Sequence, residues 1–118
     1  MTRELEGRAA IITGAARNIG RAIALDLAAA GAAVLVHAKS SADLAAAVVQ
    51  EIEAKGGRAR LHLADVTVPE QAAATVAAAV EAFGRLDILV SNAALRKETA
   101  FETMSFAEWH EVLAVIRD

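Results

Sequence analysis

The sequence predicts an α/β fold in which a parallel sheet is covered by helices on both faces. Two observations carry this prediction. Short apolar runs alternate with longer helix-forming segments along the 118 residues, and a glycine-spaced turn from Gly14 to Gly20 follows the first apolar run. Strands joined by helical crossovers pair in parallel with right-handed connections, and such a sheet is buried on both faces.

The first strand, helix and strand each carry a distinct signal. Residues 8–13 contain Ala-Ala-Ile-Ile, a run too continuous for a strand with one exposed face, so burial on both faces is expected. A helix is expected from Asn18 to about Ala30, because Gly31 follows as a helix-ending residue. A second strand over residues 33–37 completes a strand–helix–strand unit.

The second helix is expected over residues 41–55. Within it Leu44, Val48 and Ile52 recur at every fourth position, which predicts one apolar stripe facing the core. Two glycines end this helix, and a third strand is expected over residues 58–64.

A third helix follows, and its start has the sequence of a capped helix. Thr67 is the expected capping residue, with Pro69 in the first turn and Glu70 three residues on. The elements that complete the pattern are this helix over residues 67–83, a fourth strand over 86–90 and a last helix that begins near Phe101 or Ser105.

Composition limits the classes of function. The chain is 56% hydrophobic but only 3% aromatic, which predicts one soluble domain with a core of Ala, Val, Leu and Ile. No apolar stretch reaches the about 18 residues of a membrane span, and the charged N-terminus has no apolar signal core, so we expect a cytoplasmic protein. The net charge of −3, without a basic cluster, does not favour nucleic acid as a partner.

Cysteine and histidine usage argues against several kinds of site. The chain has no cysteine, which excludes disulfides and thiolate catalysis. His37, His62 and His110 lie far apart without the close spacing of metal ligands, so we expect no metal site and assign these side chains structural or solvent-facing roles.

The turn Thr13-Gly14-Ala15-Ala16-Arg17-Asn18-Ile19-Gly20 is typical of a phosphate-binding segment. Gly14 lets the backbone turn sharply after a strand, and Gly20 lets the next helix pack close to the sheet, so that the free N–H groups of the helix start face an anion. A dinucleotide pyrophosphate is the expected anion. The alternative is that both glycines serve only the turn and its packing.

Four motifs, in this order, resemble the short-chain dehydrogenase/reductases of the ketoreductase type. They are Thr13-Gly14-x-x-x-Asn18-Ile19-Gly20, Asp65-Val66, Asp87-Ile88-Leu89-Val90 and Asn92-Ala93-Ala94. The resemblance implies a Rossmann-type doubly wound parallel sheet with strand order third-second-first-fourth, of which residues 1–118 form a single incomplete dinucleotide-binding domain. Asn18, Ser91 and Ala94 depart from the family pattern, although Asn tolerates the left-handed backbone angles that glycine supplies there.

The resemblance also implies a cofactor site. Its residues are Gly14, Arg17, Asn18, Ile19, Gly20, Lys39, Asp65, Val66, Asn92, Ala93 and Ala94. In this family Asp65 would hold the adenine amino group, and Asn92 would lie near the ribose and nicotinamide. Asp65 could instead be a helix-capping or loop acid, and Asn92 could belong to a simple strand-exit turn.

Charge at the end of the second strand favours NADP over NAD. An NAD site usually places an acid there to accept both ribose hydroxyls, but this chain has Ala38 followed by Lys39. Arg17 supplies a second cation at the position where NADP-preferring relatives carry one, and two cations can hold a 2′-phosphate. Taken separately, Arg17 and Lys39 would be ordinary surface charges.

The family's reaction is hydride transfer between the nicotinamide and a carbonyl or alcohol substrate, as in 3-oxoacyl reductases. Its Ser and Tyr-x-x-x-Lys would follow Asp118, the chain has no tyrosine, and Ile116 stands where the relay Asn is expected. We therefore assign no catalytic residue and expect an N-terminal piece of an oxidoreductase, inactive alone and part of a homo-oligomer. The alternative is a complete small α/β protein that binds a nucleotide or a partner without catalysis.

Overall fold

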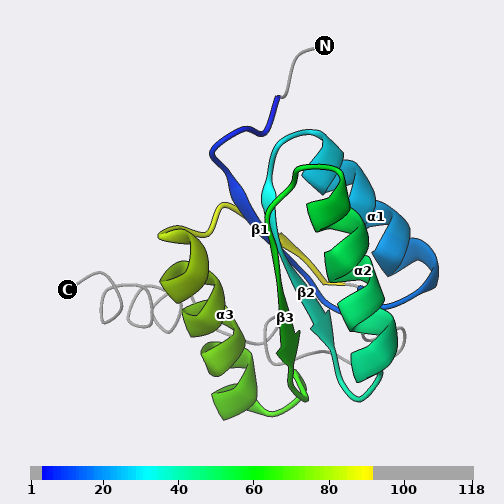
Figure 1. Ribbon diagram of the computed structural model, residues 1–118. Coiled ribbons are helices and arrows are strands. Elements are labelled where there is room, and N and C mark those ends of the chain that lie inside the picture. Colours follow the sequence, from blue (N-terminus) through cyan, green and yellow to red (C-terminus); the bar gives the residue numbers. More distant parts are fainter. Residues whose placement is uncertain (1–3, 92–118) are drawn as a thin grey trace.

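The computed structural model describes residues 4–91, which form a four-stranded parallel sheet with three helices (Figure 1). The strands lie side by side in the order β3-β2-β1-β4, as the family resemblance implied. In chain order the elements are β1 (Ala9–Ile12), α1 (Asn18–Ala29), β2 (Ala33–Ala38), α2 (Ala42–Ala54), β3 (Ala59–Leu63), α3 (Pro69–Phe83) and β4 (Ile88–Val90). The expected last helix lies outside the described residues.

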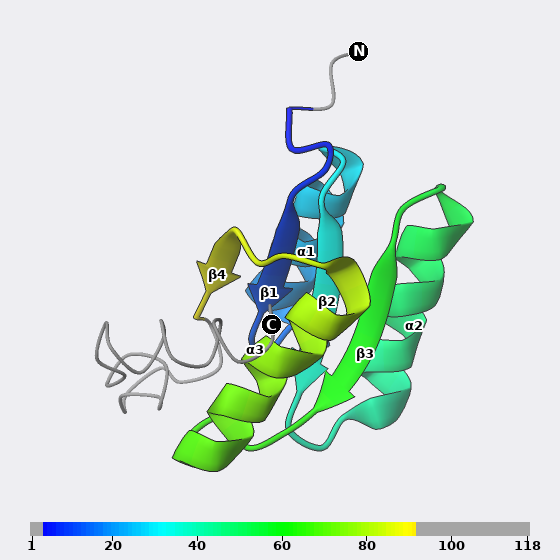
Figure 2. The ribbon, with the colours of Figure 1, turned by 90° about the vertical axis from the view of Figure 1, so that its left-hand side faces the viewer.

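Helices cover both faces of the sheet, so the predicted doubly wound α/β fold is confirmed. Figure 2 shows α3 in front of the sheet and α1 and α2 behind it. Alternate residues of the central strands point to opposite faces: Ile12 and Val36 pack with α1 and α2, whereas Ile11 and Leu35 pack with α3. Strands β1 and β2 are buried along their whole length, as expected of a continuous apolar run.

The small residues of α1 explain how closely it approaches the sheet. Its buried positions are Gly20, Ala24 and Ala28, one every four residues, and none carries a side chain larger than a methyl group. The helix ends at Ala29, and Gly31 adopts a left-handed φ of 105° that starts the turn into β2.

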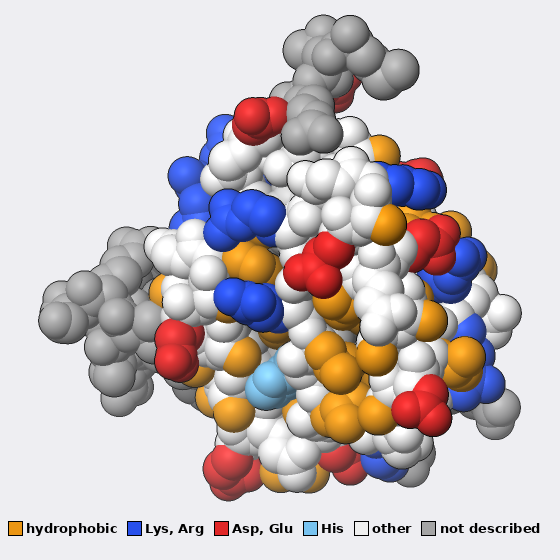
Figure 3. All heavy atoms as spheres, in the orientation of Figure 1, with side chains coloured by type: hydrophobic (Ala, Val, Ile, Leu, Met, Phe, Trp, Pro, Cys, Tyr) orange, Lys and Arg blue, Asp and Glu red, His pale blue; other side chains and the backbone are white. Residues whose placement is uncertain are grey.

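The apolar stripe expected on α2 is partly wrong. Val48 and Ile52 are buried, but Leu44 is 45% exposed and Ala45 takes the third buried position. The helical repeat of 3.6 residues explains this, because positions 45, 48 and 52 keep to one face while position 44 turns away from it. Figure 3 shows a group of hydrophobic side chains gathered over α2 and β3, and the large exposed ones on these elements are Leu44, Leu61 and Leu63.

The capped start expected for α3 is also wrong. The residue at the cap position is Val68, whose side chain has no polar atom that could accept a hydrogen bond from a helix amide. Thr67 is turned the other way: its amide and hydroxyl both donate to Oδ1 of Asp65, at 3.0 and 2.5 Å. The end of α3 at Phe83 is as expected, because Gly84 adopts a left-handed φ of 80° and its amide donates to the Val80 carbonyl.

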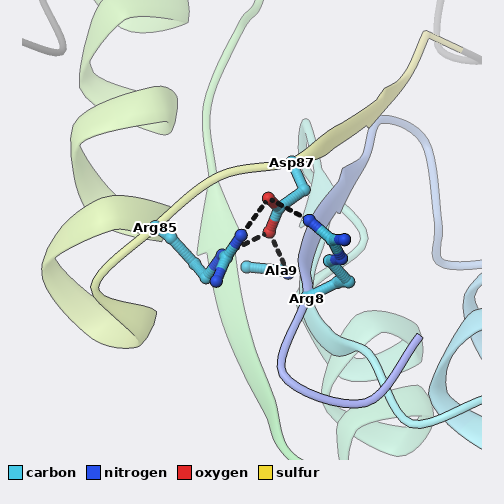
Figure 4. Close-up of polar contacts among 4 residues, drawn as sticks. All are labelled: Arg8, Ala9, Arg85 and Asp87. Atoms are coloured by element: carbon cyan, nitrogen blue, oxygen red, sulfur yellow. Dashed lines mark hydrogen bonds and ion pairs between the residues drawn. The ribbon is translucent and has the colours of Figure 1, made fainter.

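The amino ends of β1 and β4 are joined by one carboxylate. Asp87 accepts two hydrogen bonds of 2.7 Å from the Arg85 guanidinium, one of 3.4 Å from Arg8 and one of 2.9 Å from the backbone amide of Ala9 (Figure 4). These contacts, Arg85 first, lower the pKa of Asp87 to about 2. The Asp87 amide also donates to the Ala9 carbonyl at 2.9 Å, so backbone bonding to β1 is present at Asp87, although β4 itself begins at Ile88, two residues later than the sequence predicts.

Within residues 4–91, none of the helices has the length and apolar character needed to cross a membrane.

Candidate cofactor-binding site

The carboxyl ends of the parallel strands meet at one edge of the sheet. There the glycine turn follows β1, Lys39 follows β2 and Asp65 follows β3. Backbone hydrogen bonds continue just beyond the ends of β1 and β3. The Thr13 amide donates to the Val90 carbonyl at 3.0 Å, and the Ala64 amide donates to the Ala38 carbonyl at 3.1 Å. This edge of a doubly wound sheet is where ligands bind in such folds.

The glycine turn has two residues with left-handed backbone angles. Gly14 has a φ of 64° and Asn18 a φ of 56°, and Asn18 is the one non-glycine residue with positive φ in the described part of the chain. The expectation that asparagine keeps this turn is therefore borne out by its geometry, since Asn adopts such angles more readily than other side-chain-bearing residues.

The start of α1 follows the glycine turn at the carboxyl edge of the sheet. Arg17 occupies the cap position in an extended conformation and makes no side-chain capping bond. The first amides of a helix have no intrahelical acceptor, so the N–H groups of Asn18, Ile19 and Gly20 have the geometry to donate to an anion. Ile19 is exposed beside them, whereas Gly20 is buried against the sheet as predicted.

The earlier amides of the turn are already bonded to His37, the fifth residue of β2. The Gly14 amide donates to Nδ1 of His37 at 3.0 Å, and the Ala15 amide donates to the His37 carbonyl at 2.8 Å. The opposite ring nitrogen, Nε2, lies 2.7 Å from the carbonyl of Ala64. His37 therefore joins the glycine turn to the end of β3, a role that its sequence position alone did not indicate.

Burial sets the ionisation of this ring. His37 is 1% exposed, and the loss of solvation lowers its pKa, partly opposed by the hydrogen bond to Ala64. The available signal was a histidine inside the otherwise apolar run of β2, because a polar side chain in a fully buried strand needs hydrogen-bond partners.

Two cations flank the end of β2. The Arg17 guanidinium donates to Oγ of Ser41 at 2.8 Å, at the start of α2, and Lys39 Nζ lies 3.7 Å from Oδ2 of Asp65. The Lys39 side chain is 72% exposed. Between them Ala38 is buried, with no carboxylate at the end of the strand. Lys39 lies within the β2–α2 connection and Arg17 bonds to Ser41 at its end, so both cations lie at the ligand edge of the sheet.

Asp65 organises its own loop. Its Oδ1 accepts both Thr67 bonds, which together with Lys39 lower the pKa of its carboxyl group and keep it ionised. Its amide donates to Oε1 of Gln71 at 2.6 Å. Val66 is buried in the apolar cluster under α3 and anchors the loop. Asp65 thus has the loop role that was one of its two expected roles, and its contact with adenine stays a prediction. The cofactor contacts of Asn92, Ala93 and Ala94 also stay predictions, because these residues lie outside the described residues.

Comparison with known proteins decides the family. The family model described as short chain dehydrogenase matches residues 8–116. The chain belongs to the short-chain dehydrogenases. Members of this family are oxidoreductases that bind NAD or NADP.

Several relatives share this part of the chain. An uncharacterized oxidoreductase of Methylorubrum extorquens is 45% identical over 112 residues, which are 95% of this chain and 45% of that protein. The 3-oxoacyl-acyl-carrier-protein reductase FabG of Staphylococcus epidermidis is 40% identical over 106 residues, 90% of this chain and 43% of the reductase. The chain thus spans less than half the length of these curated relatives.

Solved short-chain dehydrogenases have the same fold. A dehydrogenase/reductase from Sinorhizobium meliloti 1021 superposes with a TM-score of 0.77 at 42% identity, covering 97% of this chain and 45% of its own. A 7α-hydroxysteroid dehydrogenase, solved as a complex with NADH and 7-oxo glycochenodeoxycholic acid, gives 0.75 at 32% identity, covering 98% of this chain and 49% of its own.

Proposed function

We propose that this chain is the cofactor-binding part of an NADP(H)-dependent short-chain dehydrogenase that acts on a carbonyl/alcohol pair, in the manner of a 3-oxoacyl reductase. The observation that carries the cofactor choice is the charge pattern at the end of β2. Lys39 directly follows the buried Ala38, where an NAD-binding relative would carry an acid, and Arg17 reaches the same β2–α2 connection through Ser41.

The site fits a dinucleotide by its geometry. The first amides of α1, those of Asn18, Ile19 and Gly20, would bind the pyrophosphate, and the close approach of α1 through Gly20 brings these amides to the sheet edge. Asp65, whose side chain is partly exposed beside Lys39, would accept from the adenine amino group, and Val66 holds its loop in place. When bound, NADP(H) supplies the hydride-transfer chemistry.

The two cations would hold the 2′-phosphate together. Arg17 already donates to Ser41, so its guanidinium is directed toward the start of α2. Among residues 4–91, the ion pair of Lys39 is the Asp65 contact of 3.7 Å, longer than a strong charge-assisted hydrogen bond, so a phosphate can draw Lys39 away at little loss.

These 118 residues would bind the cofactor without supplying the acid for the reaction. The chain contains no tyrosine, and Ile116, at the position expected for the relay Asn, lies outside the described residues. We therefore expect no NADPH oxidation by the 118-residue chain with a panel of carbonyl substrates, 3-oxoacyl thioesters included. Steady turnover by purified chain would refute this part of the proposal. A cytoplasmic location and a homo-oligomeric state stay predictions of the sequence.

The cofactor choice is tested by measuring dissociation constants for NADPH and NADH in the full-length protein, at fixed salt because phosphate contacts are screened. Lys39→Ala and Arg17→Ala should each weaken NADPH binding by roughly 1–3 kcal/mol, the value of a charged hydrogen bond, and leave NADH nearly unchanged. Arg21→Ala is the matched control. This arginine lies one turn further along α1 and pairs with Glu51 at 2.6 Å, so its loss should change neither constant.

Two results would overturn the choice of NADP. One is a parent protein that binds NADH more tightly than NADPH. The other is an equal weakening of both cofactors by Lys39→Ala, which would make the cations ordinary surface charges.

A further inference from the structure

His37 is a buried polar group that the roles assigned above do not use. Its side chain joins two segments that are distant in sequence, Gly14 and Ala64, which lie 23 and 27 residues from it. One of these segments is the glycine turn proposed to bind pyrophosphate, and the other leads directly into Asp65. The ring therefore lies between the two loops that would hold the pyrophosphate and the adenine of the cofactor.

The partners of the ring determine which nitrogen carries the proton. A backbone N–H can only donate, so the 3.0 Å contact from the Gly14 amide requires a bare Nδ1. A carbonyl oxygen can only accept, so the 2.7 Å contact to Ala64 requires a proton on Nε2. His37 is thus held as the neutral Nε2–H tautomer, with both ring nitrogens satisfied.

Protonation would break this arrangement. A proton on Nδ1 would face the N–H of Gly14, and two donors repel each other, so the turn and the ring would have to separate. Within residues 4–91, two titratable groups act on the ring: His62 in β3, which disfavours a positive charge, and Asp65, which favours one but is paired with Lys39. Burial is the largest effect, and it favours the neutral form.

We propose that His37 is a positioning residue that holds the glycine turn and the Asp65 loop at the separation needed by the adenosine diphosphate half of the cofactor, and that acid releases this hold. The inference rests on the proposed dinucleotide site. It predicts that affinity for the cofactor falls as His37 takes up a proton, although His37 itself touches no part of the ligand.

The tautomer is tested without any cofactor. In a protein labelled with nitrogen-15 histidine, long-range proton–nitrogen spectra at pH 7.5 should show His37 with an unprotonated Nδ1 and a protonated Nε2. A protonated Nδ1, or a charged ring, at this pH would overturn the inference. This measurement uses the unsubstituted protein, so it does not depend on any variant folding.

The positioning role is tested by the pH profile of cofactor affinity between pH 8 and 5.5. The 2′-phosphate of NADPH titrates near pH 6, so NADH, which lacks it, is measured in parallel. Affinity for both cofactors should fall toward low pH, by up to about tenfold per pH unit once the ring titrates. His37→Phe, which keeps the bulk and removes both bonds, should weaken both cofactors by roughly tenfold already at pH 8.

Two further variants separate positioning from packing. His37→Gln retains a donor and an acceptor but cannot be protonated, so it should restore most of the affinity at pH 8 and remove the pH dependence seen with NADH. His62→Gln removes a histidine of the neighbouring strand that disfavours a positive charge on His37, so it should keep the fall in affinity but move it to higher pH. If the NADH affinity of the parent has the same pH dependence as that of His37→Gln, the positioning role fails but the proposed cofactor site is unaffected. If the parent binds neither cofactor, the proposed function fails as well.

Discussion

At the amino ends of β1 and β4, charged side chains bind one another and the backbone, whereas at the carboxyl ends a neutral histidine joins the backbone segments and the Lys39 side chain is largely exposed. Asp87 has four donors within 3.4 Å from Arg8, Ala9 and Arg85. Lys39, at the other end, has one acceptor at 3.7 Å and is mostly exposed. At the amino ends, the carboxylate of Asp87 finds its hydrogen-bond donors within the protein, without a ligand.

One end of the sheet thus contributes to the stability of the fold, and the other end has charges available for binding. A charge that is fully hydrogen-bonded within the protein contributes to folding and has nothing left for a ligand. A charge held by one long contact contributes little to folding and can be recruited at small loss. Substitutions at the two ends should therefore separate into effects on unfolding and effects on cofactor binding.

The largest effect is expected from Asp87→Ala. It leaves the buried amide of Ala9 without an acceptor and two arginines without their partner, so the free energy of unfolding should fall by about 2–3 kcal/mol. Urea denaturation measures this as a lower midpoint with an unchanged slope. Arg8→Ala is the control, because its 3.4 Å contact is exposed and should contribute less than about 1 kcal/mol. Equal losses in the two variants would contradict the central place given to Asp87.

The next effect concerns the carboxyl ends of the strands and should appear mainly in cofactor binding. Ala38→Asp would place a carboxylate where it repels a 2′-phosphate and accepts from both ribose hydroxyls, so the preference should move toward NADH by roughly 1–3 kcal/mol. Because Ala38 is only 3% exposed, the same change should also lower stability when no cofactor is present. The ratio of the two dissociation constants, measured beside urea denaturation, tests both parts. An unchanged ratio would mean that the ribose does not lie at this position.

A smaller effect is the pH dependence of stability, which should differ between the two ends of the sheet. The pKa of Asp87 is lowered from 3.8 to about 2, so its contribution is complete above pH 3.8 and is lost as the pH falls toward 2. After solvent screening that loss should be about 1 kcal/mol. His37 and His62 have pKa values below the usual 6.5, so the unfolded chain gains protons first and stability falls as the pH drops below 6.5.

Stability measured from pH 8 to pH 2 should therefore fall in two separate windows. His37→Gln should make the fall in the upper window smaller, with the remainder due to His62, and leave the lower window unchanged, while Asp87→Asn should reduce the fall in the lower window only. A single fall that neither variant changes would show that other groups control the response to acid.

The smallest effect is expected on α2. Leu44→Ser should change the free energy of unfolding by less than about 0.5 kcal/mol, because Leu44 is exposed. Val48→Ala, on the buried face of the same helix, should lower it by about 1–3 kcal/mol. Thermal or urea denaturation of the two variants side by side checks whether the buried face is the one with Ala45, Val48 and Ile52.

Local sequence patterns predicted most of the fold. The continuous apolar runs gave β1 and β2, and the glycines at 31 and 84 gave the ends of α1 and α3, because burial and left-handed turns leave signals in adjacent residues. The errors concern the exact starts of two elements. The Thr67 hydroxyl donates to Asp65, two residues before it, and Val68 takes the cap position of α3. Both the amide and the carboxylate of Asp87 bond with Ala9, although β4 begins at Ile88.

The candidate site was predictable only in outline. The glycine turn and the cations Arg17 and Lys39 follow from motif and charge. The contacts of His37 with Gly14 and Ala64 do not, because they join three strand ends whose proximity exists only in the folded sheet. The Lys39–Asp65 pair is likewise invisible in sequence, since it depends on β2 and β3 lying side by side.

The strand order has a consequence for how the chain folds. Strand β1 pairs on one side with β2, which follows it closely, and on the other with β4, so the Ala9–Asp87 bond closes a loop of 78 residues. Long-range pairing of this kind slows folding, because the entropy of loop closure is lost before the contact forms. During synthesis the ribosome must extend the chain past Asp87 before the centre of the sheet can acquire its second neighbour. Until then one side of β1 offers unpaired backbone groups, which makes this interval the one in which chains are most prone to associate with each other.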